Sequence, residues 1–308
     1  MNNCGNAPYV CVMLASYNGE KFIREQIDSI LCQEAVRIKL IIRDDGSKDN
    51  TLKIAEEYKM LGNTEILTGQ NVGPANNFFE LLQIAPDAEY YAWADQDDIW
   101  DTDKLKIAVE MIRKIDDKPA LYYSASRTVD KNNNYLATIG ADSPSLSYGA
   151  ALIRSKAQGA TFVFNRQLLD IVKIFCPDFK SCGILHDAWL HRVCLAVGGV
   201  VIHDPNPHMS YRIHGNNVVA KISTNKMRDR IATFLNDTVP NYSSVVAEQI
   251  FEGYKSYLPK ENYKLTYDLA YYRVRIKCKL KVLASSEYKV GVFKEDLKFK
   301  IKILLNKA

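Results

Sequence analysis

The chain has 308 residues, of which 47% are hydrophobic and 25% are charged, a balance typical of soluble globular proteins. This length is sufficient for one large α/β domain or for two smaller ones. The longest apolar run near the start, residues 9–15, is too short to span a bilayer and follows no basic residue. We therefore expect neither a transmembrane segment nor a signal peptide there, and predict a cytoplasmic location.

Charge is unevenly distributed along the chain. The formal net charge is +4, but residues 273–308 contain eleven Lys/Arg and three Asp/Glu, a local net charge of +8. Residues 1–272 are therefore mildly acidic, at −4. A basic tail of this kind suits an anionic membrane face or a nucleic acid. The alternative is an ordinary solvated helical surface.

The seven cysteines do not predict a disulfide framework, because their number is odd and no CxxC pair occurs. Two histidines and three cysteines cluster in the sequence and raise the alternative of a zinc site: Cys176, Cys182, His186, His191 and Cys194. Their spacing fits no common structural zinc pattern. We expect buried free thiols instead.

The first hundred residues alternate between short apolar runs and segments with apolar residues at helical spacing. The predicted strands are residues 9–15, 38–42, 64–68 and 90–94. Helices are predicted between them, the third opening after Pro74. This alternation predicts a parallel sheet with right-handed crossovers.

Polar segments follow three of these four strands: residues 16–20, 44–47 and 95–98. The carboxyl ends of parallel strands meet at one edge of a sheet, so the three segments are predicted to form a single site. The last of them brings three carboxylates within four residues, and these stay ionised together only beside water or a cation. A divalent ion with oxygen ligands would suit them. The alternative is an acidic turn that caps a helix beginning near Thr102.

Beyond residue 100 the pattern is less regular. Helices are predicted at 105–112, 168–175 and 187–197, and strands at 121–129, 159–165 and 200–203. Residues 131–147, rich in Asn, Ser and Gly, are predicted to form a loop. The polar segment 210–217 ends the compact part, and residues from about 225 onward are predicted to be mostly helical. Residues 273–281 alternate like a strand, but the helical segments around them favour a helix.

A set of short motifs, in this order, resembles family 2 glycosyltransferases. The motifs are Ala15-Ser16-Tyr17-Asn18-Gly19, Asp44-Asp45-Gly46-Ser47, Asn71-Val72-Gly73, Asp95-Gln96-Asp97-Asp98, His186-Asp187-Ala188-Trp189 and Arg212-Ile213-His214-Gly215-Asn216. The resemblance implies an α/β fold of the GT-A type, with a mostly parallel central sheet flanked by helices. It also implies an inverting mechanism and a nucleotide-sugar donor.

The resemblance covers about residues 9–217 and divides the chain. Residues 1–218 would be the catalytic domain, with a nucleotide-binding half at about 8–100 and an acceptor half at about 101–218. Residues 219–308 would be a helical, basic extension near a membrane. Whether the protein forms a homodimer is left open, and no nucleic-acid partner is expected, since the body is acidic and carries no recognition motif.

The forms of the motifs at residues 95–100 and 186–189 look most like bacterial enzymes that build surface polysaccharides. Prominent among these are rhamnosyltransferases that use dTDP-rhamnose, with a saccharide or lipid-linked saccharide as acceptor. A UDP-hexose donor is one alternative. In other classes, the alternatives are a sugar nucleotidyltransferase, a metal-dependent phosphoryl hydrolase and a non-catalytic saccharide- or nucleotide-binding module. A nucleotidyltransferase would usually carry a Gly-rich basic loop after its first strand, which residues 16–20 do not provide.

The resemblance also implies roles for individual residues. Nucleotide contacts are expected from Ser16, Asn18, Asp44, Asp45, Gly73, Asn76, Asp95 and Arg212. Mg²⁺ or Mn²⁺ would be held by Asp97 and His214. The acceptor and sugar pocket would include Asp98, Trp100, His186 and Trp189.

Asp187 would be the catalytic base. Glycosyl transfer needs a group that takes the proton of the attacking hydroxyl, and a single carboxylate opposite the leaving group gives inversion. His186 and Trp189 flank Asp187, and partial burial would raise its pKa toward that of a base. The alternative is an N-cap of the following helix, a role that is compatible with the first.

Overall fold

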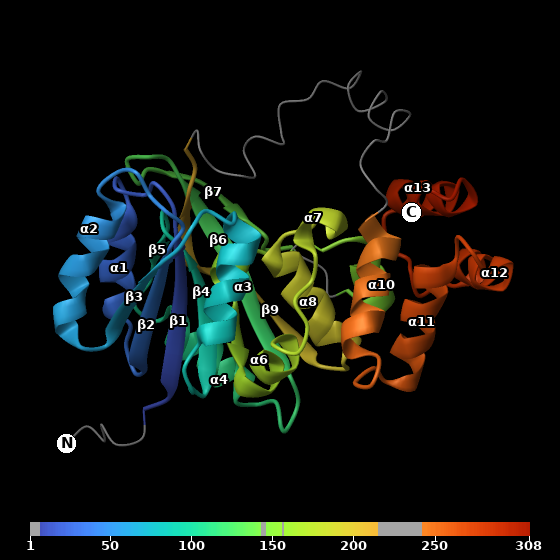
Figure 1. Cartoon of the computed structure of the whole chain (residues 1–308), viewed down its shortest axis with the longest axis horizontal. Coiled ribbons are helices and arrows are strands. Elements are labelled where there is room, and N and C mark those ends of the chain that lie inside the picture. The colour runs from blue at the N-terminus through green and yellow to red at the C-terminus, as the bar shows by residue number, and fades with distance from the viewer. Residues whose placement is uncertain (1–6, 143–145, 156, 215–241) are drawn as a thin grey trace.

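The computed structural model describes residues 7–142, 146–155, 157–214 and 242–308. Figure 1 shows a sheet flanked by helices at one end of an elongated molecule, and the last four helices at the other end. Three sequence predictions fall outside the described residues: the end of the polar segment at 215–217, the helical content of 225–241, and the domain boundary at 218.

Among the residues just given, nine strands form one sheet, in the order β3-β2-β1-β4-β8-β6-β9-β5, with β7 paired to β6. Strands β1 to β4 are parallel, β8 is antiparallel to both β4 and β6, and β6 is parallel to β9. The α/β fold is therefore confirmed, with a parallel first half and a mixed second half. The strands are β1 (Tyr9–Ser16), β2 (Arg37–Asp44), β3 (Thr64–Thr68), β4 (Tyr90–Asp95), β5 (Ile99–Trp100), β6 (Ala120–Val129), β7 (Tyr135–Ile139), β8 (Val163–Asn165) and β9 (Val200–Arg212).

Helices cover both faces of this sheet (Figure 1). Those of the first half are α1 (Ile23–Leu31), α2 (Thr51–Glu56), α3 (Pro74–Ile84) and α4 (Lys104–Ile112), with a 3₁₀ turn at Glu57–Leu61. Those of the second half are α5 (Tyr148–Ile153), α6 (Arg166–Val172), α7 (Phe179–Cys182) and α8 (His186–Ala196), with a 3₁₀ turn at Gly159–Thr161. The last four are α10 (Tyr242–Tyr254), α11 (Lys260–Tyr271), α12 (Ile276–Ala284) and α13 (Phe293–Leu304).

The strand β1 shows why the sheet has two cores. Its side chains alternate between faces, as the pleat requires. Cys11 and Met13 belong to the core that includes α3 and α8, whereas Val10, Val12 and Leu14 belong to the core that includes α1 and α4. Both faces are buried, which explains the continuous apolar run.

Two predictions about the second half were wrong. Residues 131–147 contain β7 and lead into α5, and β9 continues to Arg212 instead of ending at 203. β7 is paired to β6 but is almost wholly exposed. Because neither face of β7 is buried, its sequence lacks the apolar alternation that predicts a strand. β9 contains Pro205 and Pro207, which discourage a strand prediction, and the structure accommodates them with register shifts against β6.

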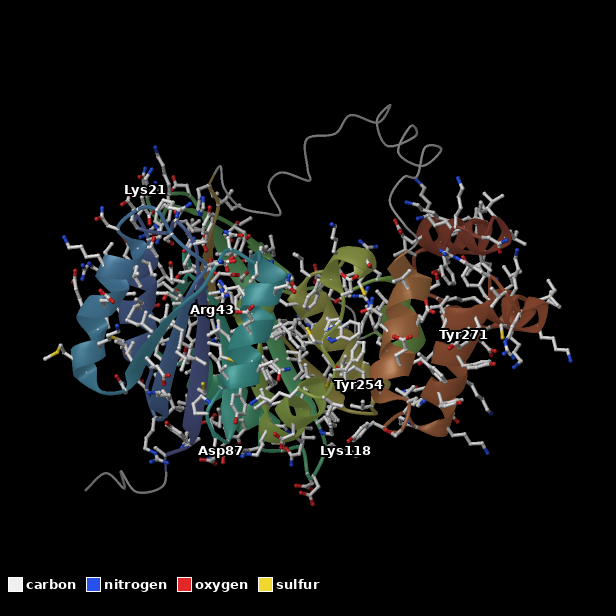
Figure 2. All side chains as sticks on the ribbon, in the orientation of Figure 1. Lys21, Arg43, Asp87, Lys118, Tyr254 and Tyr271 are labelled. Atoms are coloured by element: carbon white, nitrogen blue, oxygen red, sulfur yellow. The ribbon has the colours of Figure 1, made fainter. Side chains whose placement is uncertain are left out.

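The C-terminal helices share the core of the second half. Val246, Ile250 and Tyr254 of α10 lie in the same buried cluster as Trp189 of α8. The Tyr254 hydroxyl donates to the carbonyls of Val172 and Phe175, and Figure 2 labels Tyr254 at this junction. The prediction of a helix rather than a strand near residues 273–281 is confirmed by α12.

Cys182 and Cys194 are buried free thiols, whereas Cys176 is free and exposed. Among the residues that the structure describes, no helix has both the length and the apolar character needed to cross a bilayer.

Candidate active site

Three polar segments do meet at one edge of the sheet. In the strand register Ser16 lies opposite Asp44, and Ala15 lies opposite Asp95. The Ser16 hydroxyl donates to Asp44 Oδ2 over 3.1 Å, and the Asp45 amide donates to the Ser16 carbonyl over 2.8 Å. In Figure 2 Lys21 marks this edge, and Asp87 and Lys118 mark the opposite one.

The loop after β1 is held by a side chain that the sequence analysis did not assign to the site. Gln96 accepts from the Tyr17 amide over 2.8 Å and donates to the Tyr17 carbonyl over 2.9 Å. A Cβ on Gly19 would come within 2.1 Å of Gln96 Oε1, so a larger residue there would displace the Gln96 side chain. Asn18 adopts a left-handed φ of 49° and accepts from the Lys48 amide. Gln96 stands within the Asp95–Asp98 motif, and this position in the sequence could have pointed to it.

Asp45 organises the turn before α3. Its carboxylate accepts from the amides of Val72 and Gly73 at 3.0–3.1 Å and pairs with Arg43 at 2.7 Å. Gly73 has a φ of +81°, a conformation that glycine adopts without strain. Asn76 is exposed at the start of α3 and donates to the Val72 carbonyl. Asp45, Gly73 and Asn76, which are predicted to contact the nucleotide, therefore lie together at the turn before α3.

The two predicted metal ligands are in direct contact. His214 Nε2 lies 2.6 Å from Asp97 Oδ2, and both side chains are partly exposed. The imidazole of His214 stacks on Phe22, with ring centroids 5.1 Å apart. Phe22 was not among the predicted site residues, and nothing in the sequence pairs it with residue 214.

Arg212 is buried at the base of this pair. Its Nε donates to the Asp97 carbonyl over 3.0 Å, and Nη2 pairs with Glu25 at 2.7 Å. Its guanidinium also lies over the Phe22 ring, 4.4 Å from the centroid. Arg212 therefore connects the end of β9 to the acidic segment and to α1.

The acidic segment concentrates negative charge. Burial, followed by the charges of Asp97 and Asp187, raises the pKa of Asp95 to about 7. Burial, followed by the charges of Asp97 and Asp95, raises the pKa of Asp98 well above its usual value, and Asp98 Oδ2 is buried without a hydrogen-bond partner among the described residues. A divalent cation would compensate such a charge cluster, so this part of the edge fits a metal ion on chemical grounds.

Asp187 lies within electrostatic range of that cluster, at the start of α8. Its Oδ2 accepts from the Gly159 amide over 3.3 Å, and Oδ1 from the Ala188 amide over 2.6 Å. The next residue of the 3₁₀ turn, Ala160, accepts from Lys104 Nζ over 2.8 Å. Lys104 is fully buried and is attracted by Asp98 and Asp95, so one lysine ties the acidic segment to the turn that holds Asp187.

The four residues predicted to line a sugar pocket are buried in this structure. Trp100 is 3% exposed beneath the ammonium of Lys104, and Trp189 is 1% exposed against Tyr254. His186 stacks on Phe78 at 4.0 Å, and burial lowers its pKa to about 4. Asp98 accepts from the Arg212 amide. Because core packing covers these four side chains, they do not present a face to a sugar in this structure. They pack against the residues that form the site.

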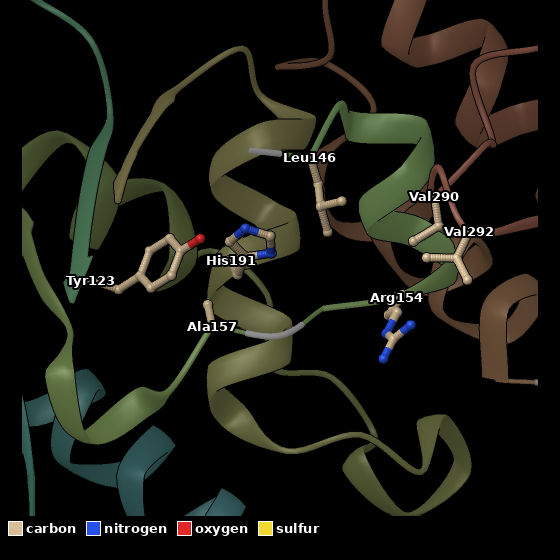
Figure 3. A pocket seen from close by; sticks show the side chains of 7 residues that line it. All are labelled: Tyr123, Leu146, Arg154, Ala157, His191, Val290 and Val292. Atoms are coloured by element: carbon tan, nitrogen blue, oxygen red, sulfur yellow. The ribbon is translucent and has the colours of Figure 1, made fainter. Parts of the chain in front are cut away.

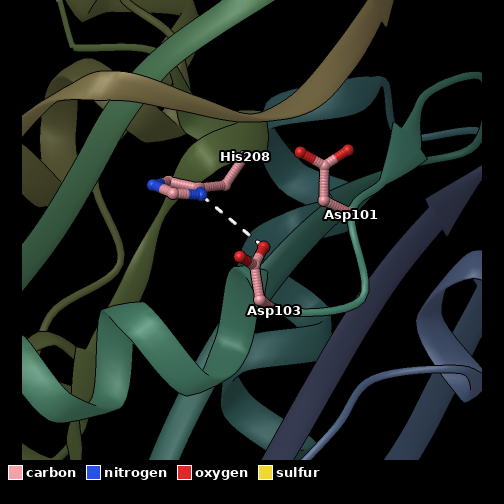
Figure 4. Close-up of side chains that lie close together, drawn as sticks. All are labelled: Asp101, Asp103 and His208. Carbon is pink, nitrogen blue, oxygen red and sulfur yellow. Dashed lines mark ion pairs between the residues drawn. The ribbon is translucent and has the colours of Figure 1, made fainter.

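A separate three-ligand group brings His208 of β9 together with Asp101 and Asp103, which lie between β5 and α4 (Figure 4). Ligand atoms of Asp101, Asp103 and His208 lie within 4.8 Å of one another. His208 is six residues before His214 on an extended strand, about 20 Å away at 3.3 Å per residue. Asp101 already pairs with Arg127, and His208 also contacts Asp204. This group is best described as an ion-pair network distinct from Asp97 and His214.

The parallel half-sheet with its acidic carboxyl edge, extended by a mixed half, has the GT-A fold. The chain belongs to glycosyl transferase family 2, whose sequence pattern matches residues 11–176.

Relatives agree with this membership. The dTDP-rhamnosyl transferase RfbG of Shigella flexneri is 31% identical over 240 residues, which cover 72% of this chain and 79% of that protein. An uncharacterized glycosyltransferase of Rickettsia typhi is 28% identical over 184 residues, covering 59% of this chain and 55% of that one.

Solved structures show the same fold. Residues 1–349 of S. aureus TarS, in complex with UDP-GlcNAc, align with a TM-score of 0.57 at 16% identity, covering 96% of this chain and 90% of that one. The mannosyltransferase PcManGT of Pyrobaculum calidifontis, in complex with GDP-Man and Mn²⁺, aligns with a TM-score of 0.53 at 15% identity, covering 99% and 89%.

Proposed function

We propose that this glycosyltransferase inverts the anomeric centre while moving L-rhamnose from dTDP-rhamnose to a hydroxyl of a surface polysaccharide or lipid-linked saccharide. The observation that carries the reaction class is the carboxylate of Asp187, held by two backbone amides within electrostatic range of Asp95. The choice of donor is supported by the dTDP-rhamnosyl transferase relative. A UDP-hexose is the alternative donor.

In this mechanism Asp187 accepts the proton of the acceptor hydroxyl as its oxygen attacks the anomeric carbon. Attack from the face opposite the departing diphosphate inverts the configuration. The amides of Gly159 and Ala188 fix the rotamer of Asp187, and the neighbouring Arg192 and Asp95 set the charge around it.

Asp97 and His214 are the residues that would hold Mg²⁺ or Mn²⁺. Such an ion, when bound, neutralises charge on the leaving diphosphate. Ser16, Asn18, Asp44, Asp45, Gly73, Asn76 and Asp95 would surround the nucleotide. Arg212 would act by placing Asp97, since its guanidinium is occupied by Glu25 and the Asp97 carbonyl.

The donor is tested by a thermal-shift panel of dTDP-rhamnose, UDP-glucose, UDP-GlcNAc and GDP-mannose with Mn²⁺. A ligand that binds only the folded state at 100 times its Kd stabilises it by about 2.7 kcal/mol. We expect dTDP-rhamnose to give the largest increase in Tm. A larger increase with a UDP-sugar would replace rhamnose as the donor, and no increase with any nucleotide sugar would contradict the proposed function.

The division into a catalytic domain at 1–218 and a helical extension at 219–308 remains part of the proposal. We further propose that the extension binds the anionic inner face of the cell membrane. Four exposed apolar side chains form a stripe on α13: Phe293, Leu297, Ile301 and Leu304. Phe293 is 80% exposed, and the opposite side of α13 is buried through Phe299 and Ile303. Val274, just before α12, and Ile276 and Leu280 on α12 are also exposed apolar side chains. Both helices are rich in lysine, so apolar insertion and attraction to anionic lipid would act together.

Replacing Phe293 and Leu297 by Glu is expected to lower binding to vesicles of phosphatidylglycerol and phosphatidylcholine at least about tenfold, because two charges enter the apolar stripe. Co-sedimentation measures the bound fraction. Leu136→Glu, at an exposed apolar site on β7, is the matched control. Unchanged vesicle binding would contradict the assignment, and so would light scattering that shows the stripe buried in a homodimer.

A further inference from the structure

The hollow beside α8 is too small for a nucleotide or a sugar. Tyr123 and His191 line it on one side, and Leu146, Val290 and Val292 line it on the other (Figure 3). It has room for about one water molecule. The donor is therefore expected at the open carboxyl edge of the sheet, where the loop after β1 lies.

The backbone of that loop is held by side chains from other segments. The four consecutive amides of residues 17–20 each donate to one such side chain, at 2.7–3.1 Å. The acceptors, in the order of the amides, are Gln96 Oε1, Ser47 Oγ, Thr51 Oγ1 and Asp49 Oδ2. Amides that are used in this way do not bind phosphate, so the loop is not the phosphate cradle that a nucleotidyltransferase needs.

The loop after β1 is also fixed to the loop after β2 in the reverse direction. The Lys48 amide donates to Asn18 Oδ1 over 2.8 Å, and the Asn50 amide donates to Glu20 Oε2 over 3.0 Å. Tyr17 is nevertheless 44% exposed. The loop therefore offers a ligand side chains on a fixed backbone, a preorganised arrangement that lowers the cost of binding.

Gln96 differs from the other three acceptors because it makes two hydrogen bonds to the backbone of one residue. It accepts from the Tyr17 amide and also donates to the Tyr17 carbonyl over 2.9 Å. Gly19 leaves the space in which Gln96 lies, since the three atoms nearest to a Cβ at Gly19 would all belong to Gln96.

Gln96 also stands between Asp95 and Asp97 in the chain. Asp95 is fixed by the pairing of β4 with β1, and the Asp97 carbonyl accepts from Arg212 Nε. The two hydrogen bonds of Gln96 therefore hold the loop after β1 in a set position relative to the acidic segment.

We propose that Gln96 is a positioning residue for nucleoside recognition: it holds the loop at residues 17–19 in the shape that binds the nucleoside, beside the acidic segment that would hold the diphosphate. This inference rests on the proposed nucleotide-sugar donor and extends it to a residue whose side chain acts through the backbone of Tyr17.

The test compares a ligand that has a nucleoside with one that has only the diphosphate. Calorimetry in Mg²⁺ measures the affinities of the native protein and of Gln96→Ala for dTDP and for pyrophosphate. We expect Gln96→Ala to bind dTDP about tenfold more weakly, because two hydrogen bonds that order the loop are lost. Its affinity for pyrophosphate should be unchanged. A purely structural role would lower the Tm and leave the ratio of the two affinities as it is in the native protein.

Gly19→Ala is a second variant that displaces Gln96 without changing it. It should reproduce the loss of dTDP affinity, and it should cost nothing further in the Gln96→Ala background, where the atoms that the new Cβ would meet are absent. Gln249→Ala is the matched control, because Gln249 accepts from the Asp178 amide over 2.8 Å away from the edge. An unchanged ratio of affinities in Gln96→Ala, or additive effects of the two substitutions, would overturn the role of Gln96.

The proposed function is judged separately on the native protein, with dTDP, UDP and GDP. If UDP or GDP binds best, the donor assignment changes and the variants are compared with that nucleotide. A native protein that binds a nucleoside diphosphate and transfers no sugar would refute the transfer and leave the role of Gln96 standing. Binding of no nucleoside diphosphate would contradict both.

Discussion

Replacing Asp187 by Asn is expected to lower kcat for sugar transfer by about 10²–10⁴-fold, the usual contribution of a positioned general base. The amide is nearly isosteric, and its single carbonyl oxygen can still accept from one of the two amides, those of Gly159 and Ala188, that hold the native carboxylate. It cannot take the proton of the acceptor hydroxyl. The affinity for the nucleotide sugar should therefore change little, because the nucleotide edge lies on other strands.

The measurement compares kcat with donor affinity in the same preparation. Asp170→Asn, at an exposed carboxylate on α6, is the matched control and should retain full activity. Normal turnover by Asp187→Asn would show that another group is the base. Loss of donor binding together with turnover would instead indicate that Asp187 maintains the structure of the edge.

Replacing Asp97 by Ala is expected to weaken metal-dependent binding of the nucleotide sugar at least about tenfold, or about 1.4 kcal/mol. The variant loses an anionic ligand and leaves His214 without its partner at 2.6 Å. Calorimetric titration of the donor, with Mn²⁺ and with EDTA, measures the metal-dependent part of the affinity.

Asp101→Ala provides the control, because it disrupts the other cluster of potential ligands without touching Asp97. If the metal-dependent affinity disappears in Asp101→Ala and persists in Asp97→Ala, the ion belongs to Asp101, Asp103 and His208. Equal affinity of the native protein with Mn²⁺ and with EDTA would remove the metal from the proposal.

The structure also gives Lys104 a role in the site. Its ammonium lies 3.3 Å from the centre of the Trp100 ring, hydrogen-bonds to the Ala160 carbonyl, and is attracted by Asp98 and Asp95. The adjacent Gly159 amide holds Asp187. A buried lysine thus joins the two halves of the sheet and contacts the turn that holds the proposed base. Burial lowers the pKa of Lys104 well below its usual value, and the charges of Asp98 and Asp95 oppose that shift.

The sequence by itself determined the parallel half of the fold and the place of its acidic edge. Helical and strand periods are local properties, so the alternation from Tyr9 to Asp95 could be read without knowing which strands pair. Because parallel strands end at the same edge, the motifs at Ser16, Asp44 and Asp95 had to lie together. The resemblance added Asp187, His214 and their expected roles.

Tertiary structure alone decided which polar and aromatic side chains face solvent. Trp100 and Trp189 belong to motifs associated with the site, yet packing against Lys104 and Tyr254 buries them. Gln96, Phe22 and Lys104 act through partners far along the chain, which no local pattern encodes. The same is true of β9, whose prolines are accommodated by its register against β6. It is also true of Gly149, which meets the Glu287 carbonyl only because the C-terminal segment folds back onto α5. Local periodicity specifies elements, whereas burial and convergence depend on contacts between residues distant in sequence.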